Sequence, residues 1–161
     1  MISEEKIIKL ASEKLEELSI FIVDIQTNTQ NKIKVLLDSE KGVTIKDCVE
    51  ISRAIEHNLD REIEDFELEV SSYGLFSPLI LPLQFKKNMN KEVNVKKKDG
   101  IVEKGILSNI EFSDDEKSVE SIELKQIKKI NIKGKKKKSI IEEAVKITIQ
   151  EINEIILVSA F

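Results

Sequence analysis

The sequence has 161 residues, of which 40% are hydrophobic and 35% are charged. This composition is typical of a folded protein with one ordinary or two small domains, and it excludes general disorder. No apolar run approaches the roughly 20 residues that cross a bilayer, and the acidic residues 1–5 do not resemble a signal peptide, so we expect a cytoplasmic protein. The single cysteine, Cys48, excludes an internal disulfide.

The net charge of −4 conceals an asymmetry between the two parts of the chain. Residues 1–84 contain nine Lys and Arg against 17 Asp and Glu, a net charge of −8. Residues 85–161 contain 17 Lys against 13 Asp and Glu, a net charge of +4. Such asymmetry suggests different partners, with RNA phosphate facing the basic part, although an ordinary solvated surface is the alternative explanation.

The chain begins with the pattern of a helix followed by a hairpin. Ser3, followed by two glutamates, is a typical helix start, and apolar residues continue at helical spacing to Leu18. The β-branched residues 20–25 and the alternating residues 33–37 predict two strands. The polar residues 27–31 between them have the composition of a turn, so the two strands are expected to pair.

A second helix and a third strand are predicted next. Thr44 and Asp47 form a capping-box-like start, and an apolar face continues to Leu59. Residues 66–70 then alternate between apolar and polar, as in a strand with one solvent-facing side. The resulting order is α-β-β-α-β, which can bury both helices against one face of a three-stranded sheet.

A stiff connector follows this unit. Residues 71–82 contain Gly74 and both prolines of the chain, and proline restricts both its own backbone and that of the preceding residue. We therefore predict an N-terminal domain at 1–82 and a C-terminal domain at 83–161. Pro82 is also suited to begin a short helical turn.

The C-terminal domain is predicted to consist of short strands. An Asp-Gly pair predicts a tight turn, and strand patterns cover residues 93–95, 101–112, 119–132, 145–149 and 155–161. With a helical turn at 150–154, this pattern is typical of a small closed barrel. The predicted fold class is α+β: an N-terminal α-β-β-α-β domain followed by a small Sm-like or SH3-like β-barrel domain.

The sequence contains no arrangement of residues typical of an active site. Cys48 and His57 lie nine residues apart on the predicted second helix, so they face opposite sides of it. One Cys and one His exclude a zinc site of the usual spacing. Gly134 and Lys135 lack the second glycine and the hydroxyl residue of a phosphate-binding loop. We therefore expect no enzyme, no metal ion and no cofactor.

Residues 125–138 form the strongest electrostatic feature, with eight lysines and no acid. Lysine contacts phosphate as a point charge without reading bases, and aromatic residues for base stacking are scarce. Recognition of structured RNA through its shape and backbone therefore fits better than sequence-specific reading, with a solvated loop as the alternative. The candidate RNA-binding residues are Lys125, Lys128, Lys129, Lys133, Lys135, Lys136, Lys137 and Lys138.

The connector resembles a motif of a known family. Six of the nine residues in Ser71-Ser72-Tyr73-Gly74-Leu75-Phe76-Ser77-Pro78-Leu79 match the Ser-Ser-Pro-Gly-Leu-Asp-Arg-Pro-Leu motif of the ribosome maturation factor RimP family. The predicted hairpin and second helix also resemble the family, and the similarity weakens after Phe112. The matching residues form the candidate inter-domain motif: Ser71, Ser72, Gly74, Leu75, Pro78 and Leu79.

This resemblance implies an N-terminal α/β domain, an Sm-like barrel and no catalytic residue or cofactor. It also implies transient binding of the immature small ribosomal subunit near its decoding region, beside ribosomal RNA and a basic ribosomal protein, and we expect a monomer. Tyr73, Phe76 and Ser77 depart from the motif, and the last two remove an Asp-Arg pair whose arginine suits carboxylate or phosphate. We expect the lysine-rich segment to compensate for this loss. A general Sm-like RNA-binding module, a protein-only interaction adaptor and an uncharacterised enzyme are the alternatives.

Overall fold

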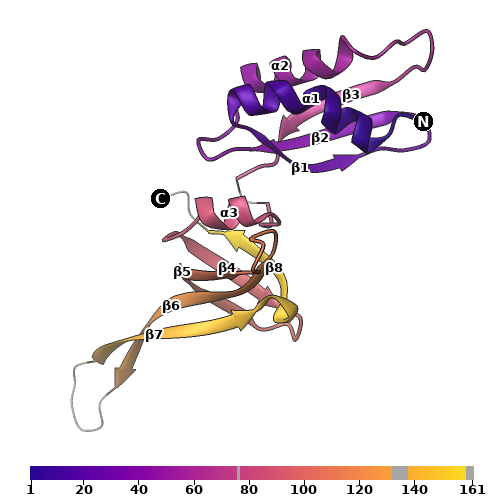
Figure 1. The fold of residues 1–161 in the computed structure, drawn as a ribbon. Coiled ribbons are helices and arrows are strands. Elements are labelled where there is room, and N and C mark those ends of the chain that lie inside the picture. Colours follow the sequence, from indigo (N-terminus) through magenta and orange to yellow (C-terminus); the bar gives the residue numbers. More distant parts are fainter. Residues whose placement is uncertain (76, 132–137, 159–161) are drawn as a thin grey trace. The chain divides into compact units, whose positions relative to one another are not determined.

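The computed structural model describes residues 1–75, 77–131 and 138–158 (Figure 1). The chain divides into two compact units, Met1–Gly74 and Leu75–Phe161. This division comes earlier than the boundary expected after residue 82.

Backbone hydrogen bonds explain where the division falls. The Tyr73 N–H donates to the Leu37 carbonyl at 2.8 Å, within the first unit. The Leu79 N–H donates to the Ile155 carbonyl at 2.9 Å, within the second unit. The segment that precedes Pro82 is therefore attached to the second unit.

The first unit has two helices covering one face of a three-stranded sheet (Figure 1). The helices are α1 (Glu4–Leu18) and α2 (Ile45–Glu56), and the strands are β1 (Phe21–Gln26), β2 (Lys32–Asp38) and β3 (Glu67–Ser72). Strand β2 is central, antiparallel to β1 and parallel to β3. The parallel pair follows from α2, which carries the chain back across the sheet between β2 and β3. The predicted α-β-β-α-β order is confirmed.

Local signals in the sequence start both helices. The Ser3 hydroxyl accepts a hydrogen bond from the Lys6 N–H at 3.2 Å. Thr44 and Asp47 form the expected reciprocal pair, with bonds of 3.1 Å and 2.9 Å. The helices then bury an apolar face against the sheet, in a core that includes Ile7, Ala11, Val35, Leu37, Ile51, Ile55 and Phe66.

The second unit is a short helix and a five-stranded antiparallel sheet. The strand order is β7-β6-β5-β4-β8, and the core includes Phe85, Val93, Leu107, Leu124 and Ile155. The elements are α3 (Pro82–Lys87), β4 (Glu92–Lys97), β5 (Val102–Phe112), β6 (Val119–Asn131), β7 (Lys138–Thr148), the 3-10 helix η1 (Ile149–Glu151) and β8 (Ile152–Leu157).

The closed barrel predicted from the sequence is not found among the described residues. Strands β7 and β8 lie at opposite edges of the sheet, although they are consecutive in the chain. The turn η1 separates them, and β7 pairs with β6 alone. The predicted α+β class is confirmed, whereas the predicted closure of the sheet into a barrel is wrong for the described strands.

Strands β6 and β7 extend past the rest of the sheet as a two-stranded ribbon (Figure 1). The pairing of β5 with β6 runs from Phe112–Val119 only to Ile106–Lys125. Lys125 also pairs with Ala144 of β7, and from Gln126 to Asn131 β6 pairs with β7 alone, whose matching residues run from Lys138 to Glu143. We call residues 125–131 and 138–144 the ribbon. Because β7 begins at Lys138 rather than at the expected residue 145, the ribbon was not foreseen from the sequence.

Candidate nucleic-acid interface

The ribbon carries the candidate RNA-binding lysines. Lys125 and Lys128 are exposed on β6. Lys129 and Lys138 are placed by the backbone register, in which Lys129 lies opposite Ile140 and Lys138 opposite Asn131. Four of the predicted lysines lie outside the described residues: Lys133, Lys135, Lys136 and Lys137.

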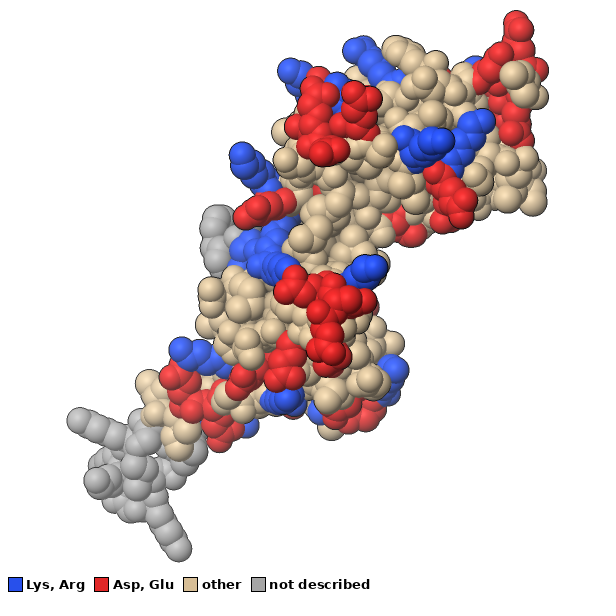
Figure 2. Space-filling view, in the orientation of Figure 1, with Lys and Arg blue, Asp and Glu red and all other residues tan. Residues whose placement is uncertain are grey.

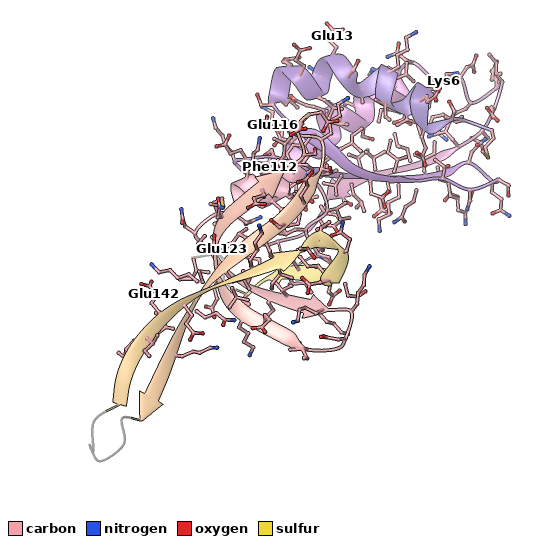
Figure 3. All side chains as sticks on the ribbon, turned by 60° about the horizontal axis from the view of Figure 1, so that its bottom comes forward. Lys6, Glu13, Phe112, Glu116, Glu123 and Glu142 are labelled. Atoms are coloured by element: carbon pink, nitrogen blue, oxygen red, sulfur yellow. The ribbon has the colours of Figure 1, made fainter. Side chains whose placement is uncertain are left out.

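Carboxylates of β7 neutralise part of this positive charge. Lys125 forms an ion pair with Glu142, and Lys128 forms one with Glu143 at 3.0 Å between nitrogen and oxygen. Figure 3 shows Glu142 farther along the β6–β7 hairpin than Glu123. The sequence segment contains no acid, so these partners were missed. The signal that reveals them is the antiparallel register, which brings the two glutamates back beside the lysines.

Isoleucines alternate with these charges on both faces of the ribbon. Ile127 and Ile140 have exposed fractions of 65% and 68%, and Ile141 has 39%. Ile127 lies opposite Glu142, whereas Ile141 lies opposite Lys128, so Ile127 and Ile141 project from opposite faces. The ribbon thus contains four lysines, two glutamates and exposed isoleucines, a mixture that the run of lysines did not predict.

A third ion pair joins β7 to β5, outside the ribbon. Lys146 of β7 contacts Glu111 of β5 at 3.1 Å, and the Ser121 hydroxyl donates to the same carboxylate at 3.0 Å. These bonds from Lys146 and Ser121 hold the pKa of Glu111 below its ordinary value. Figure 2 shows acidic and basic side chains intermingled on the visible face of the second unit. The described surface there is therefore not uniformly basic.

The residues of the connector motif are divided between the two units. Ser71 and Ser72 end β3, opposite Leu36 and Leu37. Gly74 has φ +101°, a conformation in which a side chain is strained. Leu75, Pro78 and Leu79 belong to the second unit. Phe76 lies outside the described residues, and the role of these residues as an inter-domain motif stays a prediction.

Cys48 and His57 do not have the features of an activated catalytic pair. Cys48 packs at the margin of the first core, and burial raises the pKa of its thiol, which disfavours the reactive thiolate. His57 caps the C-terminal end of α2 and is exposed. Within the described residues, no three His, Cys, Asp or Glu side chains are grouped closely enough to hold a metal ion. No helix in the same part of the chain is long and apolar enough to cross a membrane.

Comparison with known proteins identifies the family. A family model described as the RimP N-terminal domain matches residues 10–76. A protein named ribosome maturation factor RimP from Flavobacterium psychrophilum is 38% identical over 164 residues, which cover 100% of each chain. The chain belongs to the RimP family. The resemblance of the chain to this family is thereby confirmed.

Other RimP proteins match long parts of the chain. The one from Christiangramia forsetii is 47% identical over 105 residues, which cover 65% of this chain and 69% of that relative. One from Porphyromonas gingivalis is 37% identical over 138 residues, which cover 86% of each chain. The similarity therefore extends well beyond the RimP N-terminal domain.

Proposed function

We propose that this protein assists assembly of the small ribosomal subunit in the cytoplasm, as a binding protein without enzymatic activity. The observation that carries the proposal is the full-length similarity to a relative named ribosome maturation factor RimP. The protein binds immature subunits near the decoding region, where it contacts ribosomal RNA and a basic ribosomal protein. By binding an assembly intermediate more tightly than the mature particle, it shifts the population toward the productive arrangement.

The lysines of residues 125–138 supply the RNA contact in this proposal. Lys125 and Lys128 form ion pairs with glutamates of β7. Because the glutamates offset their positive charge, these two lysines contribute less to phosphate binding than lysines without such partners. We assign the main contribution to the four consecutive lysines that end the basic segment: Lys135, Lys136, Lys137 and Lys138. Each phosphate that they neutralise adds salt dependence through release of counterions.

The arrangement of the sheet edges supports action as a monomer. A ring of Sm-like subunits that associate by strand pairing needs two open edges on each copy. Here the Ile155 carbonyl of the edge strand β8 accepts a hydrogen bond from the Leu79 N–H. Because the connector occupies part of this edge, the alternative of a ring-forming RNA-binding module is disfavoured.

A lysine-to-alanine variant tests the proposal. We expect replacement of Lys135, Lys136, Lys137 and Lys138 by alanine to weaken binding to immature small subunits and to flatten its salt dependence. A matched control carries the same change in charge on exposed lysines of the first unit: Lys6, Lys9, Lys41 and Lys46. Binding is measured by co-sedimentation over a range of salt concentrations. Equal salt dependence of the two variants would contradict the assignment.

A further inference from the structure

The side chain of Gln126 spans the point where β5 and β6 part. Gln126 is the first residue of β6 beyond its pairing with β5, which ends at Ile106–Lys125. Its side-chain amide donates to the Glu103 carboxylate at 2.7 Å and to the Lys104 carbonyl at 3.0 Å. Both partners can only accept, so the amide nitrogen must face them. A side chain therefore continues the attachment of β6 to β5 after the backbone pairing has ended.

Gly105 leaves the room that this link needs. Residues 103, 105 and 107 share one face of β5 because side chains alternate along a strand, and Leu107 on that face is fully buried. A Cβ atom at Gly105 would lie 3.3 Å from the Gln126 Cγ atom, so Gln126 packs over the bare backbone there and reaches Glu103. Gln126 is only 9% exposed, and its bond to a carboxylate is stronger than one between neutral groups. The link is therefore sheltered and strong.

The described ion pairs of the ribbon do not attach it to the sheet. They join β6 to β7, while the ribbon projects beyond β5 (Figure 1). A pair of strands is marginally stable alone, and its twist varies more than that of a larger sheet. Asn131 lies about 17 Å along β6 from Gln126, so a pivot of about 15° there would move the Asn131 backbone by about 4 Å. A displacement of this size breaks a hydrogen bond.

We propose that Gln126 is a positioning residue for the RNA contact, because its link to Glu103 and Lys104 holds the ribbon in one direction relative to the sheet. The ribbon carries four of the candidate lysines: Lys125, Lys128, Lys129 and Lys138. Holding them in one arrangement before RNA binds lowers the loss of conformational freedom on binding. This inference rests on the proposed function, in which these lysines contact RNA, and it adds how they are positioned.

Gln126→Met removes the link with little change in volume and none in charge. Methionine keeps the length of the side chain over Gly105 but donates no hydrogen bond. Gln150→Met makes the same change at an exposed position of η1 and is the matched control. Glu103→Gln is the conservative variant, because its side-chain carbonyl still accepts the bond from Gln126. Circular dichroism checks that each variant is folded.

Pulsed electron paramagnetic resonance between two spin labels measures the direction of the ribbon. Ile140→Cys in the ribbon and Lys96→Cys in β4 carry the labels, and both positions are exposed. The background is Cys48→Ala, since Cys48 is the only cysteine of the chain. We expect one narrow distribution of distances with the link intact, with Gln150→Met and with Glu103→Gln. Gln126→Met should broaden it.

Co-sedimentation with immature small subunits over a range of salt concentrations measures the consequence for binding. Loss of a hydrogen bond to a charged group can shift the equilibrium between ribbon directions about tenfold. If the competent direction is then held about a tenth of the time, Gln126→Met binds about tenfold more weakly. The salt dependence should keep its slope, because the same lysines still neutralise the same phosphates. Replacement of the lysines themselves, by contrast, flattens that slope.

Three results would overturn the proposal. Gln126→Met leaves the distribution of distances as narrow as Gln150→Met does, or it broadens the distribution without weakening binding, or Glu103→Gln broadens it as much as Gln126→Met does. If the unaltered protein does not bind small subunits at all, the function proposed above fails and the positioning role fails with it. The distances are measured on the protein alone, so they still show whether Gln126 holds the ribbon.

Discussion

The close packing at Gly105 gives a sharp prediction about the stability of the second unit. A Cβ atom at this position would lie 2.9 Å from the Lys125 carbonyl oxygen and 3.1 Å from the Leu124 Cβ atom. Leu124 is fully buried and the oxygen belongs to the backbone, so neither yields easily. Overpacking of this kind destabilises the folded state by about 1–3 kcal/mol. Alanine also restricts the unfolded chain more than glycine does, which offsets at most about 1 kcal/mol of this loss. We expect Gly105→Ala to lower the free energy of unfolding by about 1–2 kcal/mol.

Urea unfolding followed by circular dichroism measures this change, and Gly100 provides a matched control. Gly100 has φ +89° and no neighbouring atom within 4 Å of an added Cβ, so alanine there is strained only by its backbone conformation. Asparagine tolerates that conformation and should restore most of the stability at Gly100. At Gly105, asparagine should be no better than alanine. An unchanged stability of Gly105→Ala, or its rescue by asparagine, would refute the reasoning from close packing.

Three further predictions concern other contacts. Thr44→Ala should lower the free energy of unfolding of the first unit by about 1 kcal/mol because it removes the cap of α2; an unchanged urea midpoint would contradict this. Ile51 is fully buried, so Ile51→Ala should cost about 2–5 kcal/mol, and a smaller loss would mean that the core collapses around the cavity. Because the pKa of Glu111 is lowered in the folded protein, its ionised carboxylate stabilises the fold at pH values above the ordinary carboxyl pKa. This stabilisation is lost as the pH falls through the folded-state pKa. Glu111→Gln should therefore flatten the decline of stability with acid, measured by urea unfolding at several pH values, and an identical pH profile would rule out this role.

Local signals in the sequence were sufficient to predict most of the first unit. The pair Thr44 and Asp47 marked the start of α2, and alternation marked β2 and β3. The parallel pairing of β2 with β3 was not stated from the sequence, although the helix between them requires a crossover. Capping and alternation depend on neighbouring residues, so they can be recognised without knowing the tertiary structure.

The second unit was predicted less well because its main feature depends on pairing between distant residues. The start of β7 has two consecutive isoleucines, Ile140 and Ile141, followed by Glu142 and Glu143. This pattern does not alternate, since residues 140–144 are all exposed, and so the strand went unrecognised. Barrel closure was expected from the number of strands, but the described strands β7 and β8 do not pair.

The candidate site shows the same limit. Eight lysines in one segment predicted a basic surface, yet the register places Glu142 and Glu143 beside two of them. The separation of β5 from β6 beyond Lys125 had no signal in the sequence because it depends on the pairing of distant residues. Charge counted along the chain supports RNA as a predicted partner, whereas the balance of charge at the surface depends on the pairing of strands.

Co-sedimentation of the purified protein with free small subunits, large subunits and whole ribosomes tests the central claim most directly. The proposed role in assembly predicts binding to free small subunits that is selective, strongest for immature particles and weakened by moderate salt. Equal binding to every particle would reduce the interaction to nonspecific attraction between lysines and RNA. Such a result, or no binding at all, would contradict a role in small-subunit assembly.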